Sequence, residues 1–218
     1  MGEDLTQEKE REHKFFASWY PKAAAQMDRQ GLAEYRRKML HGLTGEVVEI
    51  GPGHGPNFAL YPPEVTRVLA VEPEPHMREL AVTAAAGVAV PIEVVPGSAE
   101  RIPAEDATFD AAVVSLVLCS VGDQVAVLRE VRRVLRPGGQ LRFMEHVLSA
   151  SRPAAMVQRT LDATRLWPAI AGGCRCSRDT AAAIGQAGFD IDESERFPFP
   201  AGGLPTLTRP HLRGTAHC

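Results

Sequence analysis

The order of apolar and polar residues divides the chain into a charged N-terminal segment and a longer part with alternating strand and helix patterns. Residues 4–41 are charged and helical in character, with Pro21 as an interruption, which predicts two helices packed on a later domain. From Glu46 onward, short runs rich in Val and Ile alternate with longer amphipathic stretches. This alternation is typical of an α/β fold, in which a mostly parallel sheet carries helices on both faces.

The apolar runs predict seven strands. They cover residues 46–50, 68–71, 93–96, 111–115, 139–146, 189–197 and 211–217. The last run is predicted as a short edge strand, because the tail before it, from Pro198, is rich in Pro and Gly. Apolar positions recur at helical spacing from Val125 to Leu135, which predicts a helix before the fifth strand. Further helices are predicted near 157–166 and 178–187.

Length, charge and hydropathy indicate a single-domain protein that binds neither nucleic acid nor a membrane. A chain of 218 residues fits one domain, and no linker divides it. The net charge of -3 gives no general attraction for a polyanion, so no nucleic-acid partner is predicted. No run approaches the roughly 18 uninterrupted apolar residues that a membrane span needs, and the first residues are too charged for a signal peptide. We therefore expect a cytoplasmic protein with no membrane partner.

The four cysteines indicate neither a disulfide framework nor a metal centre. Cys119, Cys174, Cys176 and Cys218 are few and irregularly spaced, and thiols stay reduced in the cytoplasm. Cys174 and Cys176 form a C-x-C pair, but no second pair is present to complete a tetrahedral zinc site. We predict that the protein has no metal site.

A glycine-rich loop directly after the first predicted strand carries the strongest chemical signal. The segment from Glu49 to Gly55 reads E-I-G-P-G-H-G, with a glycine at every second position. Glycines let the backbone approach a ligand closely, but a dinucleotide-binding loop has the spacing G-x-G-x-x-G. The acid before the glycines would repel a phosphate and suits a cationic ligand. Glu49 therefore favours S-adenosylmethionine over NAD.

Further polar residues follow the next strands of the predicted sheet. Glu72 ends the second strand, where an acid can accept hydrogen bonds from both hydroxyls of a ribose. The segment 97–100, G-S-A-E, ends the third strand, where a polar loop could reach an adenine edge. Ligands of open α/β sheets collect at these carboxyl ends of the strands.

Taken together, these motifs resemble the class I S-adenosylmethionine-dependent methyltransferases, and the likeness spans residues 46–146. It implies a Rossmann-like fold and S-adenosylmethionine as cofactor, with S-adenosylhomocysteine as product. On this likeness the glycine loop holds the methionine portion, Glu72 the ribose, the loop at 98–100 the adenine and residues 115–116 the floor beside the sulfonium. The implied cofactor-binding residues are Glu49, Gly51, Gly53, Gly55, Asn57, Glu72, Pro73, Met77, Ser98, Ala99, Glu100, Ser115 and Leu116.

A narrower likeness points to the acceptor. The segments L-V-L-C-S-V at 116–121, F-M-E-H-V at 143–147 and R-P-H at 209–211 look like those of the methyltransferase-like protein 7 group, animal enzymes that methylate alkyl thiols, and their bacterial relatives. The animal proteins begin with a hydrophobic anchor and this chain begins with charged residues, so membrane association is not carried over. The resemblance implies one domain over 1–218: a helical lid over 1–41, a cofactor-binding core over 46–146 and a C-terminal part over 147–218 that completes the sheet and the acceptor pocket.

Methyl transfer to a thiol needs alignment, exclusion of water and a thiolate, so the chemistry does not demand a catalytic residue. As catalytic candidates we name His146, a proton acceptor near neutral pH or a structural histidine, and Glu145, a proton acceptor or a cofactor-side group. The candidates for the acceptor pocket are Trp19, Tyr20, Cys119 and His211. Ordinary packing is the preferred interpretation of Trp19 and Tyr20. Cys119 suits a small buried residue better than a nucleophile, and a surface position suits His211 almost as well.

Three other functions stay open. The chain could methylate oxygen, nitrogen or carbon of a secondary metabolite or quinone, because such an enzyme shares every cofactor residue. It could also bind S-adenosylmethionine without turnover, as a sensor or partner subunit. Methylation of RNA or protein is the least favoured, since no basic stripe or appended recognition domain is present.

Overall fold

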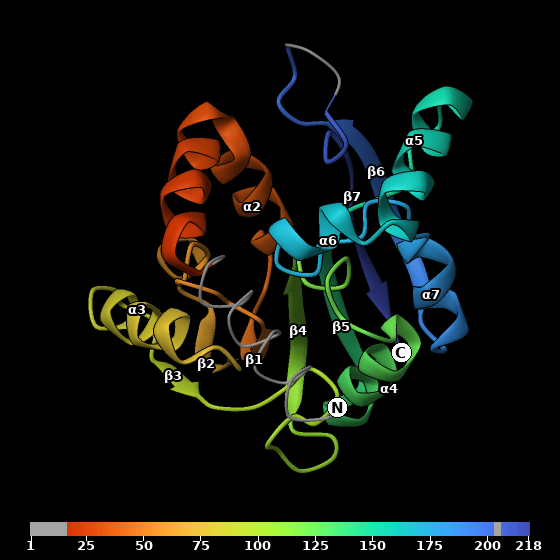
Figure 1. The fold of residues 1–218 in the computed structure, drawn as a ribbon. Helices are drawn as coiled ribbons and strands as arrows, with labels where there is room; N and C mark the ends of the chain where they lie inside the picture. The colour runs from red at the N-terminus through yellow and green to blue at the C-terminus, as the bar shows by residue number, and fades with distance from the viewer. Residues whose placement is uncertain (1–16, 203–205) are drawn as a thin grey trace, which may run out of the picture.

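A seven-stranded sheet forms the centre of the computed structural model, which describes residues 17–202 and 206–218 (Figure 1). The strand order is β3-β2-β1-β4-β5-β7-β6. The strands are β1 (Gly45–Ile50), β2 (Val65–Val71), β3 (Ile92–Val95), β4 (Phe109–Ser115), β5 (Leu135–His146), β6 (Asp190–Pro198) and β7 (Pro210–His217). Strands β1 to β5 pair in parallel and β7 pairs antiparallel with both neighbours, so the predicted mostly parallel, Rossmann-like sheet is confirmed.

Helices cover both faces of this sheet, as predicted (Figure 1). They are residues 17–27, the π-helical turn η1 (Asp28–Leu32), α2 (Ala33–Leu40), the short η2 (Phe58–Leu60), α3 (Pro75–Ala85), α4 (Gln124–Val134), α5 (Arg152–Ala163), α6 (Leu166–Ile170) and α7 (Thr180–Gln186). Within the described ranges no helix is long and apolar enough to cross a membrane.

The central strands bury both faces, which explains their nearly continuous apolar runs. Successive side chains of a strand point to opposite faces. Val48 therefore packs with the core on the side of α4 and α7, whereas its neighbour Val47 packs with the core on the side of α2. Leu141 and Met144 of β5 divide between the same two cores. Because both faces are fixed in this way, the register that sets the strand ends is fixed as well.

The prediction of an edge strand at residues 211–217 is wrong. Strand β7 lies between β5 and β6, and β6 forms the edge. The burial of the two strands gives the reason: β7 buries Leu212 and Ala216, whereas β6 is exposed along most of its length and carries Asp190, Asp192 and Glu193. Charged side chains are suited to an edge because they oppose pairing with a further strand.

The expected interruption at Pro21 is also wrong. Residues 17–27 form one continuous helix through Pro21. Proline removes only the hydrogen bond that its own N–H would donate, to Ala17 in this case. The chain changes direction at Gly31 instead, where φ is 113°, a value that favours glycine. This bend lets α2 pack against β5 and β7, close to the carboxyl ends of the parallel strands.

Candidate active site

The carboxyl ends of four adjacent strands gather polar side chains at one edge of the sheet. The four strands are consecutive in the sheet, in the order β2-β1-β4-β5, and all run in the same direction. Glu49 is the penultimate residue of β1, Glu72 directly follows β2, and Ser115 and His146 are the last residues of β4 and β5. This is the edge at which open α/β sheets bind ligands.

The glycine loop adopts a backbone that other residues avoid. Gly51, Gly53 and Gly55 have φ values of 60°, 60° and 83°. A Cβ atom on Gly51 would lie 2.7 Å from Cγ2 of Val117, so a side chain does not fit there. A Cβ atom on Gly53 would meet nothing within 4 Å and would project into open space. The loop thus presents bare backbone to a ligand, as a cradle for the amino-acid end of S-adenosylmethionine requires.

Glu49 is held beneath this loop as a buried acid. Asn57 Nδ2 and Tyr61 Oη each donate a hydrogen bond of 2.7 Å to its carboxylate, one to each oxygen. Burial raises the pKa of Glu49 above its usual value, and these two hydrogen bonds oppose the shift. Glu49 and Asn57 were expected at the site from the sequence, whereas Tyr61, which follows the loop and is 7% exposed, was not.

Arg36 of α2 is a site residue that the sequence analysis missed entirely. Its side chain is 2% exposed, and its Nε donates to Asp28 Oδ1 at 3.1 Å. Its Nη1 donates to Asn57 Oδ1 at 3.2 Å and to Ser115 Oγ at 3.0 Å. Arg36 therefore places a buried cation between the glycine loop and the end of β4. A weak signal existed, because Arg36 follows the buried Leu32 at helical spacing.

Glu72 joins the end of β2 to the glycine loop. Gly53 N donates to its Oε2 at 2.9 Å, and Glu74 N donates to its Oε1 at 3.0 Å. Burial raises the pKa of Glu72, and these backbone bonds lower it. Of its predicted neighbours, Pro73 is exposed, whereas Met77 is buried on α3, whose first turn is capped by Glu74.

The loop after β3 is the most open part of the predicted cofactor site. Ser98 forms an isolated bridge with Arg101, Ala99 packs against the larger core and Glu100 is exposed. Ser115 and Leu116 lie at the end of β4. Leu116 has a φ of 60° and donates its N–H to Met144 O at 2.8 Å. Such a conformation costs a non-glycine residue of order 1 kcal/mol and is often found at binding sites.

The structure argues against the predicted role of Glu145 as a proton acceptor or a cofactor-side group. Glu145 is fully buried, and its Oε1 accepts hydrogen bonds from the backbone of Val117 and Leu118 at 2.9 and 3.0 Å. Its Oε2 accepts one from Cys119 N at 3.1 Å. Burial raises the pKa of Glu145 to about 7, although all three bonds oppose the shift. Glu145 thus positions the loop after β4.

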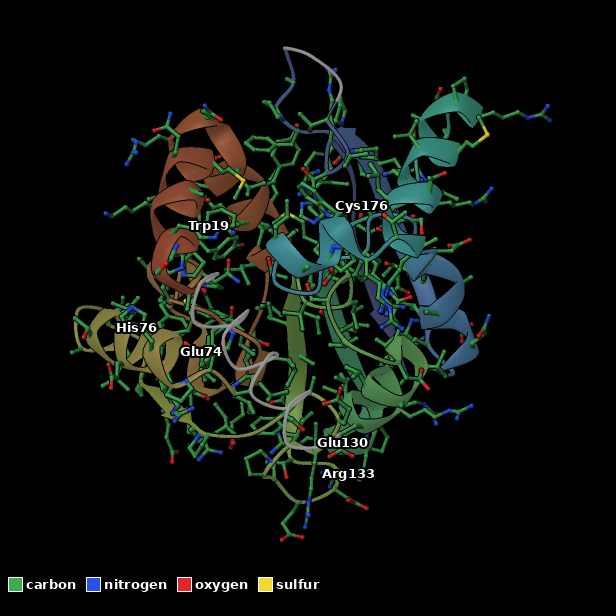
Figure 2. The ribbon with its side chains drawn as sticks, in the orientation of Figure 1. Trp19, Glu74, His76, Glu130, Arg133 and Cys176 are labelled. Atoms are coloured by element: carbon green, nitrogen blue, oxygen red, sulfur yellow. The ribbon has the colours of Figure 1, made fainter. Side chains whose placement is uncertain are left out.

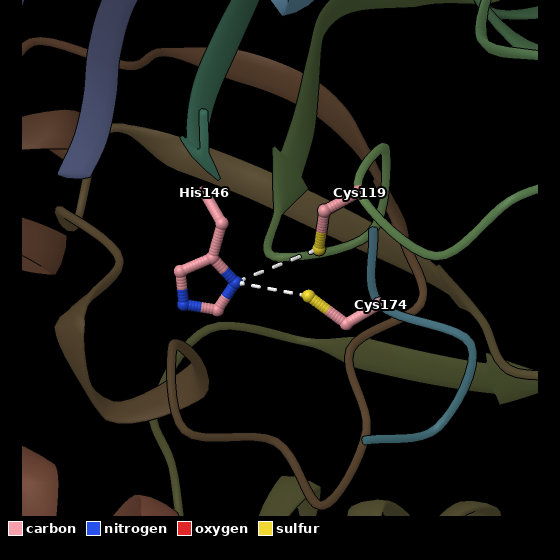
Figure 3. A group of neighbouring side chains, drawn as sticks. All are labelled: Cys119, His146 and Cys174. Atoms are coloured by element: carbon pink, nitrogen blue, oxygen red, sulfur yellow. Dashed lines mark hydrogen bonds between the residues drawn. The ribbon is translucent and has the colours of Figure 1, made fainter. Parts of the chain in front are cut away.

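His146 faces two thiols (Figure 3). Its Nδ1 lies 3.7 Å from Cys119 Sγ and 3.4 Å from Cys174 Sγ. Burial, and secondly the neighbouring His211, lower the pKa of His146 well below its usual value. A hydrogen bond with the Cys174 thiol, followed by burial, raises the pKa of Cys119, which fits its expected character as a small buried residue. The C-x-C pair thus contributes Cys174 to a cluster that its spacing did not predict.

Three further residues were expected at the acceptor pocket: His211 and Tyr20 are close to the site residues, whereas Trp19 lies at the surface. His211 is 3% exposed, so a surface position is excluded, and its ring centre lies 4.6 Å from that of His146. The ring of Tyr20 lies 6.3 Å from that of His54 in the glycine loop. Trp19 projects from the helix of residues 17–27 and is 39% exposed, so tight core packing is not its role (Figure 2).

Comparison with known proteins agrees with this geometry. Residues 48–143 match the model of a methyltransferase domain. Human thiol S-methyltransferase TMT1B is 40% identical over 186 residues, which cover 82% of this chain and 74% of that protein. A demethylmenaquinone methyltransferase of Mycobacterium tuberculosis is 48% identical over 61 residues, 28% of this chain and 26% of that protein.

Among solved structures, a SAM-dependent methyltransferase of Thermotoga maritima superimposes with a TM-score of 0.67 at 19% identity, over 94% of this chain and 98% of that chain. This likeness concerns the fold. The identity to human TMT1B extends well beyond the glycine loop, over most of both chains. The chain belongs to the class I S-adenosylmethionine-dependent methyltransferase family that includes TMT1B.

Proposed function

We propose that this protein transfers the methyl group of S-adenosylmethionine to the thiol of a small molecule. The observation that carries the proposal is the buried pair of opposite charges at the glycine loop. Arg36 is hydrogen-bonded to Asn57, and Asn57 is hydrogen-bonded to Glu49. The amino-acid end of the donor carries one carboxylate and one ammonium group, so it fits a site with one cation and one acid. The thiol acceptor is inferred from the relationship to human thiol S-methyltransferase TMT1B.

Each part of the donor has a candidate partner. Arg36 binds the carboxylate and Glu49 attracts the ammonium group. Glu72 accepts hydrogen bonds from the ribose hydroxyls, and the loop of Ser98 to Glu100 together with Met77 lies at the adenine. The remaining predicted contacts come from Gly51, Gly53, Gly55, Pro73, Ser115 and Leu116. In this arrangement residues 46–146 together with Arg36 bind the donor, residues 17–41 cover the acceptor, and the segment from residue 147 onward completes the sheet and the acceptor pocket within one domain. The first 16 residues of the predicted lid, and residues 203–205, lie outside the described residues.

The bound donor supplies a methyl group that its sulfonium already activates, so the protein need not build an electrophile. Alignment of two bound reactants can contribute about 7–11 kcal/mol toward the barrier. The acceptor side is lined by Tyr20, Cys119 and His211, with Trp19 at its rim. A free alkyl thiol has a pKa near 8.5, so only a few per cent is thiolate at neutral pH. We infer a small acceptor in the cytoplasm, with no nucleic acid or membrane as partner.

A product assay with a panel of acceptors tests the proposal. The protein is incubated with S-adenosylmethionine and an alkyl thiol, a phenol, an amine or a quinol, and S-adenosylhomocysteine is measured by mass spectrometry. We expect the thiol to give the fastest product formation by at least about tenfold. Donor binding without product from any acceptor would contradict catalysis and favour a binding protein.

A second candidate function is methylation of a quinol. The local 48% identity to demethylmenaquinone methyltransferase favours it, although the match covers only 61 residues. The same panel separates the two functions, because product from the quinol in the absence of product from the thiol would replace the first proposal by the second.

Replacing Glu72 with alanine is expected to weaken S-adenosylmethionine binding about tenfold. The substitution removes the acceptor for the ribose hydroxyls, and a hydrogen bond to a charged group contributes about 1.5 kcal/mol or more. Isothermal titration calorimetry measures the change. Glu79→Ala is the control, because Glu79 lies on the neighbouring α3 with its side chain 81% exposed. Equal affinities of the two variants would remove Glu72 from the donor site.

A further inference from the structure

Two cysteines and a histidine from three separate parts of the chain meet beside the proposed methyl-transfer site (Figure 3). Cys119 lies in the loop after β4, His146 ends β5 and Cys174 precedes α7. One ligand atom from each residue lies within 4.8 Å of the other two. Thiolates and imidazole are the ligands that zinc prefers in proteins.

The two nitrogen-to-sulfur distances match those of a tetrahedral zinc site, and the two sulfur atoms lie within 4.8 Å of each other. With Zn–S bonds of about 2.3 Å and Zn–N bonds of about 2.0–2.1 Å, a sulfur and a nitrogen on one tetrahedral ion lie about 3.6 Å apart. The distances from His146 Nδ1 to the two sulfur atoms are 3.4 and 3.7 Å. Small side-chain movements would therefore complete the coordination.

The backbone around the cluster is fixed by its own hydrogen bonds. Cys119 N donates to the buried Glu145, and Cys119 O accepts from Arg175 N at 2.8 Å. Cys174 N donates to Ala171 O at 3.1 Å. The loop after β4 and the segment before α7 are thus joined between Cys119 and Arg175, the residue that follows Cys174. Such support is what holds metal ligands in place.

Among the described residues, three ligands rather than four come together. Cys176 Sγ lies 4.0 Å from Cys174 Sγ, yet within the described part of the chain the mutually close group contains only Cys119, His146 and Cys174. Structural zinc sites have four protein ligands, whereas catalytic sites have three and leave one position for water or substrate. The ligand count therefore favours the second type.

The cluster lies next to the candidate donor site. Val117, which contacts the Cβ position of Gly51, precedes Cys119 by only two residues. Burial raises the pKa of Tyr20 to about 12, Arg36 opposes the shift, and Cys119 and Cys174 are near enough to add to it. The Tyr20 ring also faces His54 of the glycine loop. A molecule bound at the fourth coordination position would accordingly lie close to the methionine end of the donor.

We propose that Cys119, His146 and Cys174 bind a zinc ion whose open position takes the acceptor thiol as a thiolate. The inference rests on the proposed function, and it replaces both the expectation of no metal and the role of His146 as proton acceptor. Zinc binding releases the protons of the two cysteines to solvent, and binding of the acceptor releases its thiol proton in the same way. A thiol that binds zinc loses its proton at neutral pH, whereas a free alkyl thiol mostly keeps its proton there.

The transfer step then balances without any further reactant. The thiolate sulfur forms a bond to the methyl carbon while the bond from that carbon to the sulfonium sulfur breaks. The electron pair of the broken bond stays on the sulfur of S-adenosylhomocysteine. The methylated acceptor is a neutral thioether, a weaker ligand than a thiolate, and leaves the zinc.

Metal content tests the site independently of activity. The chain is purified with a phosphine reductant in place of thiols, incubated with one equivalent of zinc and desalted, and zinc is then measured by mass spectrometry. We expect about one zinc ion per chain. Competition with a chromogenic chelator should show at least about tenfold weaker zinc affinity for Cys119→Ser, His146→Ala and Cys174→Ser. Cys218→Ser is the matched control, since Cys218 lies at the other end of β5, near Gly139.

Donor affinity, measured by calorimetry, shows that each variant is folded. The proposal is overturned if the wild-type chain retains less than about a tenth of an equivalent of zinc. It is equally overturned if folded Cys119→Ser, His146→Ala and Cys174→Ser bind zinc as tightly as Cys218→Ser.

Cobalt substitution tests whether the open position takes a thiol. Cobalt replaces zinc in such sites, and its sulfur-to-cobalt absorption bands report the number of bound thiolates. We expect 2-mercaptoethanol to increase and shift these bands, and phenol to leave them unchanged. Bands that do not respond to saturating 2-mercaptoethanol would refute binding of the acceptor to the metal.

The two proposals fail in different ways. If the chelator-treated, metal-free chain methylates thiols as fast as the zinc form, the metal proposal is wrong and the thiol methyltransferase stands. If the cobalt bands respond to thiol but only the phenol or quinol gives S-adenosylhomocysteine, the metal site stands as a thiol-binding site and the proposed acceptor class is wrong.

Discussion

Replacing Arg36 with methionine is expected to lower the affinity for S-adenosylmethionine about 100-fold. Methionine keeps an unbranched side chain that helices and cores accept, so the change removes mainly the charge and its hydrogen-bond donors. Arg36 donates hydrogen bonds to Asn57 and Ser115 and supplies the cation that we propose binds the carboxylate of the donor. A charge-assisted pair with a carboxylate is stronger than a neutral hydrogen bond, and about 3 kcal/mol corresponds to a factor of about 100.

Arg37→Met is the matched control, because it makes the same chemical change one position later. Arg37 pairs with Glu34 at the surface, where its side chain is 57% exposed. Calorimetric titration of both variants with S-adenosylmethionine and with S-adenosylhomocysteine measures the effect, and both ligands should lose affinity alike because they share the amino-acid end. Indistinguishable affinities of Arg36→Met and Arg37→Met would show that the donor carboxylate binds elsewhere.

The features of this site that the sequence predicted are local along the chain. Glu49 and the three glycines occupy seven consecutive residues, and Glu72 directly follows β2. Because parallel strands bring their carboxyl ends to one edge, an apolar run followed by a polar residue is enough to place that residue. The fold followed from the same alternation of apolar runs and amphipathic stretches.

The features that the sequence did not reveal depend on contacts between distant segments. Arg36 reaches Ser115 across 79 positions, and it lies on a helix that carries no motif. Cys119, His146 and Cys174 have no regular spacing, because three separate loops and strand ends supply them. Zinc sites recognisable from sequence have paired ligands on one turn, so a site built from single residues gives no such pattern.

The order of the last two strands shows a different limit. Each run has only a few apolar residues and a single β-branched one, Ile191 or Thr215, and a Pro- and Gly-rich connection precedes the second run. The connection does not determine on which side the returning strand pairs. The acidic residues of β6 were the better guide, since a strand with Asp190, Asp192, Glu193 and Glu195 is disfavoured between two neighbours.

Glu145→Ala is expected to lower the free energy of unfolding by about 3 kcal/mol or more. Three backbone N–H groups, those of Val117, Leu118 and Cys119, lose their acceptor in a buried place. An unsatisfied buried donor costs about 1–3 kcal/mol. Removing the buried carboxyl group recovers part of this cost, because its desolvation also opposes folding. Urea unfolding of the metal-free chain measures the difference without a contribution from bound zinc.

Two control variants separate the loss of an acceptor from the loss of a charge. Glu145→Gln keeps one oxygen of the same shape, which can still accept from Val117 and Leu118, so it should lose less than half as much stability as Glu145→Ala. Glu46→Ala removes a partly exposed acid whose partners are Arg67 and, at 3.9 Å, Arg136, and surface pairs of this kind contribute at most about 1 kcal/mol each. If Glu145→Ala were no less stable than Glu46→Ala, the carboxylate would not hold the loop after β4. The position of Cys119 would then need another explanation, since the backbone of this loop carries its thiol toward His146.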